Sequence, residues 1–394
     1  MSVDVERFIT VRSMRDVVAT RRRLIAYVWK GHGLPAGLPH VDRDVATPAD
    51  LAELRCRRYD RVTAHLAHGL VSTSYLAWPR GRHPKRLAIY HTGHGNPHAA
   101  PYDRPLLDTT QALLDVGWVV AVVDLPLLGW NASQAAGNVT SHEIFAHYEK
   151  PAFSALTFFL EPLALLVNYA YAEFGEGPIA MIGLSGGGWA TTVYAALDPR
   201  VTHSYPVAGS WPFFLRGLPP HKPNHGDWEQ RKDALPGFYT LAGYLDLYVL
   251  GSTGTGRRQL QILNTYDPVC FPGLYHRSYA GHVRRRVAAI GGGSWDVLED
   301  DTHTSHTVSD YARAVILDEL RELVRQRSRT TGRGSAAVTK RGTASASRSS
   351  ASAMTRRGTD GVATAGAEAR QGGRSPAARG HSTAGSSPTS EGNS

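Results

Sequence analysis

The sequence predicts an α/β protein with a mostly parallel central sheet and helices on both faces, an N-terminal helical extension and a disordered C-terminal tail. Three observations support this prediction. Short apolar segments alternate with segments of helical periodicity between about residues 86 and 326, as in sheets that are covered on both faces. A serine stands among glycines between an apolar segment and a segment of small residues. The composition also changes sharply near Ser328.

The order of elements follows from hydrophobic periodicity and turn residues. Residues 10–30 show helical spacing, with the basic run 21–23 expected on the solvent side, and residues 57–79 are typical of a two-stranded hairpin with its turn near 67–69. Further strands are expected at 86–91, 118–124, 179–183, 203–209, 260–265 and 294–300. Helices are expected near 105–116, 162–174, 187–197, 231–249, 277–289 and 308–326. The sheet is therefore expected to begin antiparallel and continue parallel.

Three regions are predicted: an N-terminal helical extension at 1–54, a main domain at 55–328 and a disordered tail at 329–394. The tail is rich in Ser, Ala, Gly, Thr and Arg and has almost no large apolar residues, so it cannot offset the entropy cost of ordering. Its ten Lys or Arg and three acidic residues carry +7 of the chain's net charge of +9. Because the remainder is nearly neutral, no specific nucleic-acid partner is expected.

The termini and apolar segments indicate a protein without a membrane span. The longest apolar stretch, residues 153–174, is interrupted by Glu161, Pro162 and Asn168, and is expected to form a core helix beginning at Pro162. The N-terminus has early acidic residues and no apolar segment of signal-peptide length. A cytoplasmic location is therefore expected. The sequence makes no prediction of the oligomeric state.

The serine among glycines belongs to the motif G-x-S-x-G, here Gly183-Leu184-Ser185-Gly186-Gly187. A strand that turns into a helix within two or three residues strains the residue at the apex, and its neighbours must lack side chains. The apical serine then projects into open space. This arrangement is a nucleophile elbow, although a glycine-rich chain can also produce the five-residue motif by chance.

The order of elements resembles the α/β-hydrolase fold from about Arg55 to Gln326. Beyond the elbow, the resemblance rests on "YHTGHGNP" after the third strand, "DLPLLGWN" after the fourth, an aspartate after the strand that follows the sixth, and a histidine after the last strand. The resemblance implies a catalytic triad in the chain order Ser, acid, His. It also implies cleavage of a carboxylic ester through an acyl-enzyme, without a cofactor.

The triad is predicted to consist of Ser185, Asp267 and His303. Asp267 follows a strand and precedes Pro268, and Asp227 is the alternative acid because some members of the fold place the acid after the sixth strand. His306 is the alternative base, but a base that follows the last strand almost at once favours His303.

The oxyanion hole is predicted from backbone N–H groups. One donor is expected to be Gly186, after the nucleophile, and the second His94 or Gly95 in "HTGHGNP". The pairs His91/His94 and His303/His306, with Asp300 and Asp301 nearby, raise a metal hypothesis. These pairs lie in loops and no Cys or Glu completes a tetrahedral set, so no metal site is expected.

An insertion at 210–256 contains eight aromatic residues and is expected to resemble a lid. Its aromatic side chains are expected either to line the active site or to form a small separate core. A small-molecule ester is the expected substrate. An acyltransferase or peptidase with the same triad is the alternative enzyme class, and a catalytically silent binding protein of the same fold is the alternative without chemistry.

Overall fold

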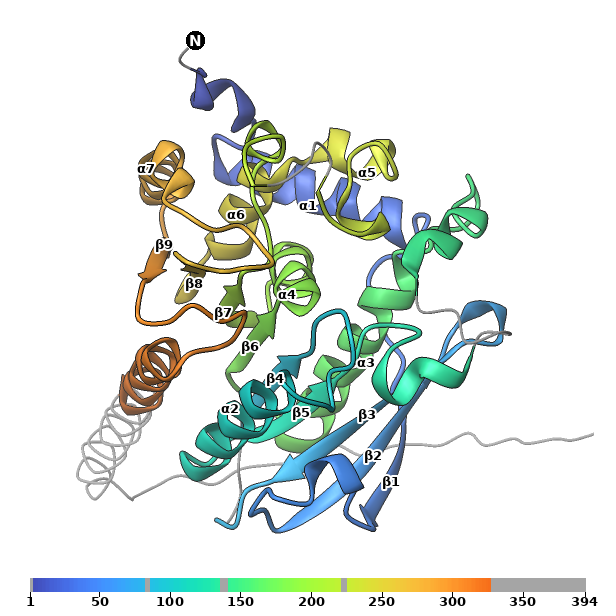
Figure 1. The fold of residues 1–394 in the computed structure, drawn as a ribbon. Coiled ribbons are helices and arrows are strands. Elements are labelled where there is room, and N and C mark those ends of the chain that lie inside the picture. The colour runs from blue at the N-terminus through green and yellow to red at the C-terminus, as the bar shows by residue number, and fades with distance from the viewer. Residues whose placement is uncertain (1–2, 82–85, 135–140, 221–224, 327–394) are drawn as a thin grey trace, which may run out of the picture. The chain divides into compact units, whose positions relative to one another are not determined.

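The computed structural model describes residues 3–81, 86–134, 141–220 and 225–326. In these ranges nine strands form one sheet in the order β1-β2-β3-β5-β4-β6-β7-β8-β9 (Figure 1). The strands are β1 (His40–Val45), β2 (Arg58–His65), β3 (Val71–Trp78), β4 (Leu87–His91), β5 (Val119–Val123), β6 (Ile179–Leu184), β7 (Val201–Val207), β8 (Arg257–Asn264) and β9 (Gly293–Asp300). The predicted tail, residues 329–394, lies outside the described residues.

The sheet begins antiparallel and becomes parallel, as the sequence predicts. β1 pairs with β2, β2 with β3 and β3 with β5 in antiparallel register, and every pair from β5-β4 to β8-β9 is parallel. β1 was not predicted. Its sequence "HVDRDV" is mostly charged and its residues are exposed or half-buried, because it forms an edge of the sheet.

The described helices mostly follow the parallel strands. They are α1 (Met14–Val28), α2 (Asp103–Asp115), α3 (Thr157–Phe174), α4 (Gly186–Leu197), α5 (Pro236–Leu241), α6 (Tyr244–Ser252) and α7 (Ala280–Ile290), and residues 310–326 are also helical. Short 3-10 turns occur at η1 (Val5–Phe8), η2 (Ala49–Leu51), η3 (Ala67–Gly69), η4 (Gly129–Gln134), η5 (His142–His147), η6 (Phe213–Leu215), η7 (Trp228–Gln230) and η8 (Tyr275–Ser278).

Two predicted helices differ from the observed ones. α3 begins at Thr157 rather than at Pro162, so the proline lies inside the helix. The single helix expected at 231–249 is two helices, α5 and α6, because Ala242 and Gly243 between them have extended backbone. Among the described residues, no helix is both long and apolar enough to cross a membrane.

Side chains on the central strands alternate between two separate cores, one on each face of the sheet. On β4, Leu87 and Ile89 belong to the core formed with α1, α3, α4, α6 and α7, whereas Ala88 and Tyr90 belong to the core formed with α2 and the helix at 310–326. The same alternation occurs on β5 and β6. All residues of these three strands are buried, which explains why they are apolar throughout.

The strand order produces a crevice beside β4. The chain passes from β4 to β5 through α2 on one face, and from β5 to β6 through α3 on the other face. β4 lies between β5 and β6 in the sheet. The connections that follow β4 and β6 pass to opposite faces of the sheet, so they separate at the carboxyl ends of these two strands. In open α/β sheets, ligands bind in the crevice outside such a switch point.

The N-terminal segment is fixed to the helices that support the middle of the sheet. Asp246, at the start of α6, accepts hydrogen bonds from the backbone N–H groups of Thr10 (2.7 Å) and Val11 (2.9 Å). Arg21 in α1 donates to the carbonyl of Ala196 in α4 (2.9 Å) and to that of Leu250 in α6 (2.8 Å). Figure 1 shows α1 beside α5 and α6. Arg21 thus binds helix carbonyls, contrary to the expectation that the basic run lies on the solvent side.

We expect the substitution Asp246→Ala to lower the free energy of unfolding by about 2–3 kcal/mol, because it leaves the buried N–H of Val11 and the partly buried N–H of Thr10 without an acceptor. Urea unfolding measures this change. Asp233→Ala is the matched control, since its side chain is 53 % exposed, and a change within about 0.5 kcal/mol is expected there. Equal stability of both variants would contradict the anchoring role of Asp246.

Candidate active site

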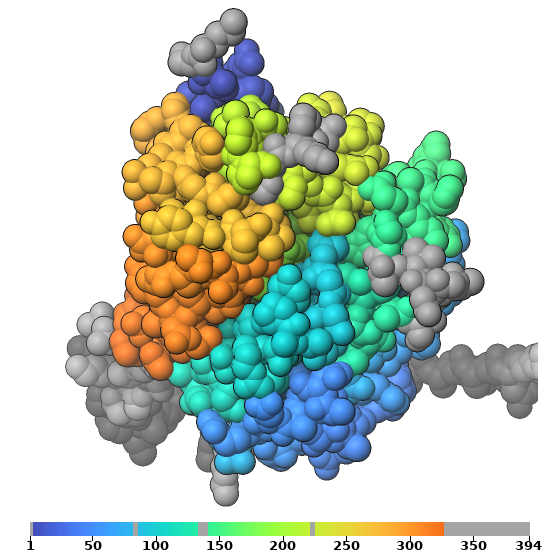
Figure 2. All heavy atoms as spheres, in the orientation of Figure 1, coloured from blue at the N-terminus to red at the C-terminus, as the bar shows by residue number. Residues whose placement is uncertain are grey.

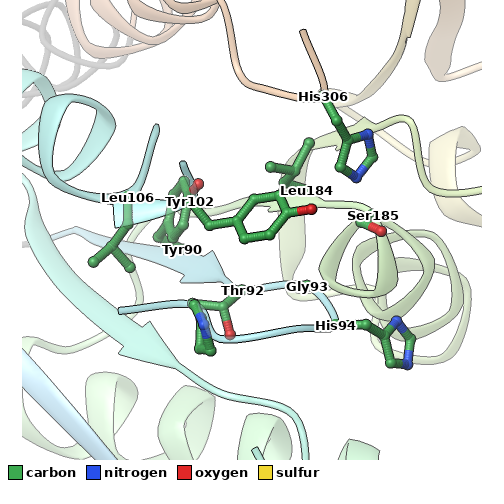
Figure 3. A pocket seen from close by; sticks show the side chains of 10 residues that line it. Tyr90, Thr92, Gly93, His94, Tyr102, Leu106, Leu184, Ser185 and His306 are labelled. Atoms are coloured by element: carbon green, nitrogen blue, oxygen red, sulfur yellow. The ribbon is translucent and has the colours of Figure 1, made fainter. Parts of the chain in front are cut away.

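Ser185 lies at the sharp turn between β6 and α4. Its φ of 57° and ψ of −119° lie in a backbone region that residues with a side chain rarely adopt. The hydrogen bond from its backbone N–H to the Val207 carbonyl (2.9 Å) holds the turn against β7. Figure 3 shows the hydroxyl group of Ser185 in a pocket, between the rings of His306 and His94 in this view.

The glycines on either side of Ser185 are required by close backbone contacts. A Cβ atom on Gly183 would overlap the carbonyl group of Gly187, and one on Gly187 would overlap the carbonyl oxygens of His91 and Thr92. The turn therefore packs directly against the end of β4. This contact explains the residue types of the G-x-S-x-G motif.

Asp267 and His306 form a buried pair near Ser185. The Nδ1 atom of His306 lies 2.8 Å from Oδ2 and 3.0 Å from Oδ1 of Asp267. The backbone N–H groups of Val269 and Cys270 donate to Oδ1 of Asp267, both at 2.8 Å, and the Asn264 amide donates to Oδ2 at 3.1 Å. The carboxylate is thus fixed, and His306 lines the same pocket as Ser185.

His303 lies in the same loop but has different partners. Its Nε2 atom is 3.4 Å from Oδ2 of Asp300, and its Nδ1 atom accepts a hydrogen bond from the backbone N–H of Ser305 at 3.1 Å. Asp300 in turn accepts hydrogen bonds from Thr302 and Ser309. His303 therefore belongs to the network that shapes the loop, and the structure brings His306 to Asp267 instead.

A thiol packs beside the serine hydroxyl. The Sγ atom of Cys270 lies 3.8 Å from Oγ of Ser185. Burial, with a smaller effect of the Asp267 charge, raises the pKa of the Cys270 thiol to about 12. The thiol form of Cys270 is therefore favoured at neutral pH, and a thiol is a weaker nucleophile than a thiolate.

The loop after β4, residues 92–98, is held at both ends by Asp124. The hydroxyl of Thr92 donates to Oδ1 of Asp124 (2.8 Å), and Nε2 of His98 lies 2.8 Å from Oδ2. Burial by itself would lower the pKa of His98, but the hydrogen bond and charge of Asp124 outweigh it and raise that pKa. Asp124 is the first residue of the segment "DLPLLGWN", for which no role was predicted from the sequence. This segment thus supports the loop at 92–98 through Asp124.

The middle of this loop contacts the turn that carries Ser185. A Cβ atom on Gly93 would lie 2.8 Å from Cβ of Ser185, and one on Gly186 would lie 2.5 Å from the ring of His94. Two of the three predicted oxyanion-hole residues, Gly186 and His94, are therefore neighbours. Gly95 has a φ of 95° and lies nearest the ring of Tyr102.

The other side of the His94 ring faces a cluster of side chains that was not predicted from the sequence. Nε2 of His94 lies 3.2 Å from Oδ2 of Asp227 and 3.2 Å from Oε1 of Glu229. It also lies 3.1 Å from Nδ1 of His142. Asp227, the alternative acid, therefore contacts His94 and not the proposed base. No spacing in the sequence links His142 or Glu229 to this loop, because their segments meet only in the folded chain.

The pocket in front of Ser185 is small, with a cavity volume of about 10 Å³. It is lined by Tyr90, Thr92, Gly93, His94, Pro97, Tyr102, Leu106, Leu184, Ser185 and His306. The rings of Tyr102 and His306 meet edge to face at 6.2 Å, and Figure 2 shows the segments around 100 (cyan) and around 300 (orange) side by side on this surface. None of the eight aromatic residues of the insertion lines the pocket. Most of them are buried in the core with α1, α3 and α4.

We expect Gly187→Ala to lower the free energy of unfolding by about 1–3 kcal/mol, because the added methyl group would overlap the end of β4. Gly217→Ala is the control, since a Cβ atom there meets nothing within 4 Å. Urea unfolding of both variants measures the difference. An unchanged stability in Gly187→Ala would show that the turn can move away from β4.

No protein-family model and no curated protein matches the chain, but solved structures do. Methylesterase BT1017 matches with a TM-score of 0.56 and 15 % identity over 79 % of this chain and 63 % of that one, so this chain spans less than two thirds of the methylesterase. The acetyl xylan esterase from Paenibacillus sp. R4 matches with a TM-score of 0.53 and 14 % identity over 81 % and 98 % of the two chains. Acetyl xylan esterase 1 from Thermoanaerobacterium sp. JW/SL YS485 matches with a TM-score of 0.52 and 13 % identity over 80 % and 96 %. The strand order, the strained turn at the end of β6 and these likenesses together show that the chain has the α/β-hydrolase fold.

Proposed function

We propose that the protein is a serine hydrolase that cleaves a carboxylic ester, with Ser185 as nucleophile, His306 as base and Asp267 as acid. The observation that carries this proposal is the 2.8 Å contact between His306 and Asp267 at the mouth of the Ser185 pocket. His306 replaces His303 as the preferred base. Three solved structures with TM-scores above 0.5 are esterases by name, which supports the same reaction.

Acylation begins with attack of the Ser185 hydroxyl on the ester carbonyl. Because Nδ1 of His306 is bonded to Asp267, Nε2 is the nitrogen that accepts the serine proton. The Asp267 carboxylate stabilises the resulting imidazolium. His306 then returns the proton to the leaving alcohol as the C–O bond breaks, which leaves Ser185 acylated.

Deacylation repeats these proton transfers with water. His306 takes a proton from the attacking water, and the second tetrahedral intermediate collapses to the free acid and Ser185. In both steps the charge on the carbonyl oxygen is stabilised by preorganised N–H donors. We assign these donors to the backbone of Gly186, at the start of α4, and of His94, rather than Gly95, because the His94 ring lies against Gly186.

The pocket favours a small acyl group. Tyr102, Leu106 and Leu184 line it, and the remaining space is narrow. A pocket of this size favours a short acyl group such as acetyl over a long chain. Two of the related structures are acetyl xylan esterases by name, in agreement with this substrate class.

The test is labelling of the purified protein with a fluorescent fluorophosphonate. We expect the wild type to be labelled, and Ser185→Ala and His306→Ala to lose labelling. Hydrolysis of p-nitrophenyl acetate should fall at least about 10³-fold in both variants.

His303→Ala is the matched control, since it removes a histidine from the same loop but not from Asp267. Retained labelling in His303→Ala with loss in His306→Ala is the expected outcome. The reverse pattern would make His303 the base, and a folded wild type without any labelling would overturn the proposed reaction.

A second measurement tests the substrate class. We expect kcat/KM for p-nitrophenyl acetate to exceed that for the octanoate ester by at least about tenfold, because the longer chain must displace pocket walls. A preference for the octanoate would show that the pocket opens in solution.

A further inference from the structure

Four side chains converge behind the loop that follows β4, and we call them the His/carboxylate cluster. Its members are His94, His142, Asp227 and Glu229, of which His94, His142 and Glu229 have ligand atoms within 4.8 Å of one another. They come from the loop after β4, from η5 and from the beginning of η7. His142 and Glu229 are almost completely buried, and the side chains of His94 and Asp227 are 22 % and 47 % exposed.

With a neutral His142, the cluster has more acceptor atoms than protons. Nε2 of His142 lies 2.9 Å from the carbonyl oxygen of Pro126, which can only accept, so this nitrogen carries a proton. In the neutral ring, Nδ1 of His142 then has a lone pair, yet it lies 3.0 Å from a carboxylate oxygen of Glu229. Either a second ring proton or a metal ion must therefore lie at this contact.

His94 can supply one proton to this cluster. Its Nε2 atom lies 3.1–3.2 Å from three acceptors at once, namely Oδ2 of Asp227, Oε1 of Glu229 and Nδ1 of His142. One donor therefore faces three acceptors, two of them carboxylates, in a largely buried place.

The distances match a metal coordination sphere. Ligand atoms about 2.0–2.1 Å from a tetrahedral zinc ion lie about 3.3 Å from one another. The candidate ligand atoms of His94, His142 and Glu229 all lie within 4.8 Å of one another, with contacts of 3.1 Å between the two histidines, 3.0 Å from His142 to Glu229 and 3.2 Å from His94 to Glu229. Asp227 lies 3.2 Å from His94 but outside this group of three. The hydrogen bond from Nε2 of His142 to a backbone carbonyl is the contact that commonly orients a metal-binding histidine.

We propose that the His/carboxylate cluster binds one Zn²⁺ ion. Two imidazoles and the Glu229 carboxylate are a ligand set that zinc accepts in tetrahedral geometry with the fourth position open to water, and the two nitrogen ligands disfavour Mg²⁺ and Ca²⁺. Asp227 is a charged outer partner of His94. The ion's charge of +2 balances the two carboxylates. The exposed side of Asp227 provides the path of entry. The ion would join the loop after β4 to the insertion, and its binding does not depend on the proposed ester hydrolysis.

The experiment measures metal content directly. The full-length protein is freed of metal with a chelator, mixed with excess ZnSO₄ and separated from free ions by gel filtration. Atomic emission should then find one zinc per chain in the wild type. Co²⁺ in place of Zn²⁺ should give the intense visible bands of a four-coordinate site.

Glu229→Gln and Asp227→Asn test the site. Glu229→Gln removes a direct ligand and should weaken Zn²⁺ binding by more than about 100-fold in competition with a chelating dye, whereas Asp227→Asn removes an outer partner and should weaken it by about 10- to 100-fold. Asp227 is half exposed, so Asp227→Asn is expected to fold even if Glu229→Gln does not, and circular dichroism checks both.

Glu299→Gln is the matched control. Glu299 also contacts a histidine, His276, at 2.7 Å, but it is paired with Arg277 outside the cluster. It should bind zinc as the wild type does. Less than about one tenth of a zinc per chain in the wild type, or equal binding in Asp227→Asn, would overturn the proposal. Esterase activity enters none of these readouts, so failure of the zinc site and failure of the proposed reaction are separate results.

Discussion

The structure around Ser185 depends on a backbone contact between the ends of two parallel strands. β4 and β6 pair side by side up to His91 and Gly183, so the turns that follow them must share one narrow space. The turn after β6 passes so close to the carbonyl groups of His91 and Thr92 that Gly187 cannot have a side chain. The same closeness brings the Ser185 hydroxyl beside the loop at 92–98, and the pocket lies where these two turns meet.

The side chains that hold this contact in place come from distant segments of the chain, and most of them are charged. Asp124 at the end of β5 fixes both ends of the loop through Thr92 and His98. Asp267 after β8 receives three N–H donors from its own turn and orients His306. Each carboxylate is buried with its acceptor atoms occupied, which makes its position well defined. The reactive groups are thus held by turns at strand ends, while the apolar strands supply a rigid base.

The sequence predicted the features that depend on local pattern. Apolar runs and glycine spacing gave the parallel strands and the turn at Ser185, and the Asp-Pro corner indicated Asp267 at a strand end. The choice between His303 and His306 could not be made from spacing, because it depends on how the loop after β9 folds around Asp300. No metal site was expected because only histidines close to one another in the sequence were compared. The His/carboxylate cluster instead combines His94 with residues that lie 48 and more positions away, and only the tertiary fold brings them together.

The anchoring of the N-terminal segment has a consequence for the order of folding during synthesis. Thr10 bonds to a residue 236 positions later, Arg21 to one 229 positions later, and Glu6 to His282, 276 positions later. These partners leave the ribosome long after α1. Contacts of such long sequence separation close large loops and carry a high entropy cost. The apolar face of α1 therefore stays exposed to solvent until most of the sheet has been made, and such transiently exposed surface favours aggregation of the nascent chain.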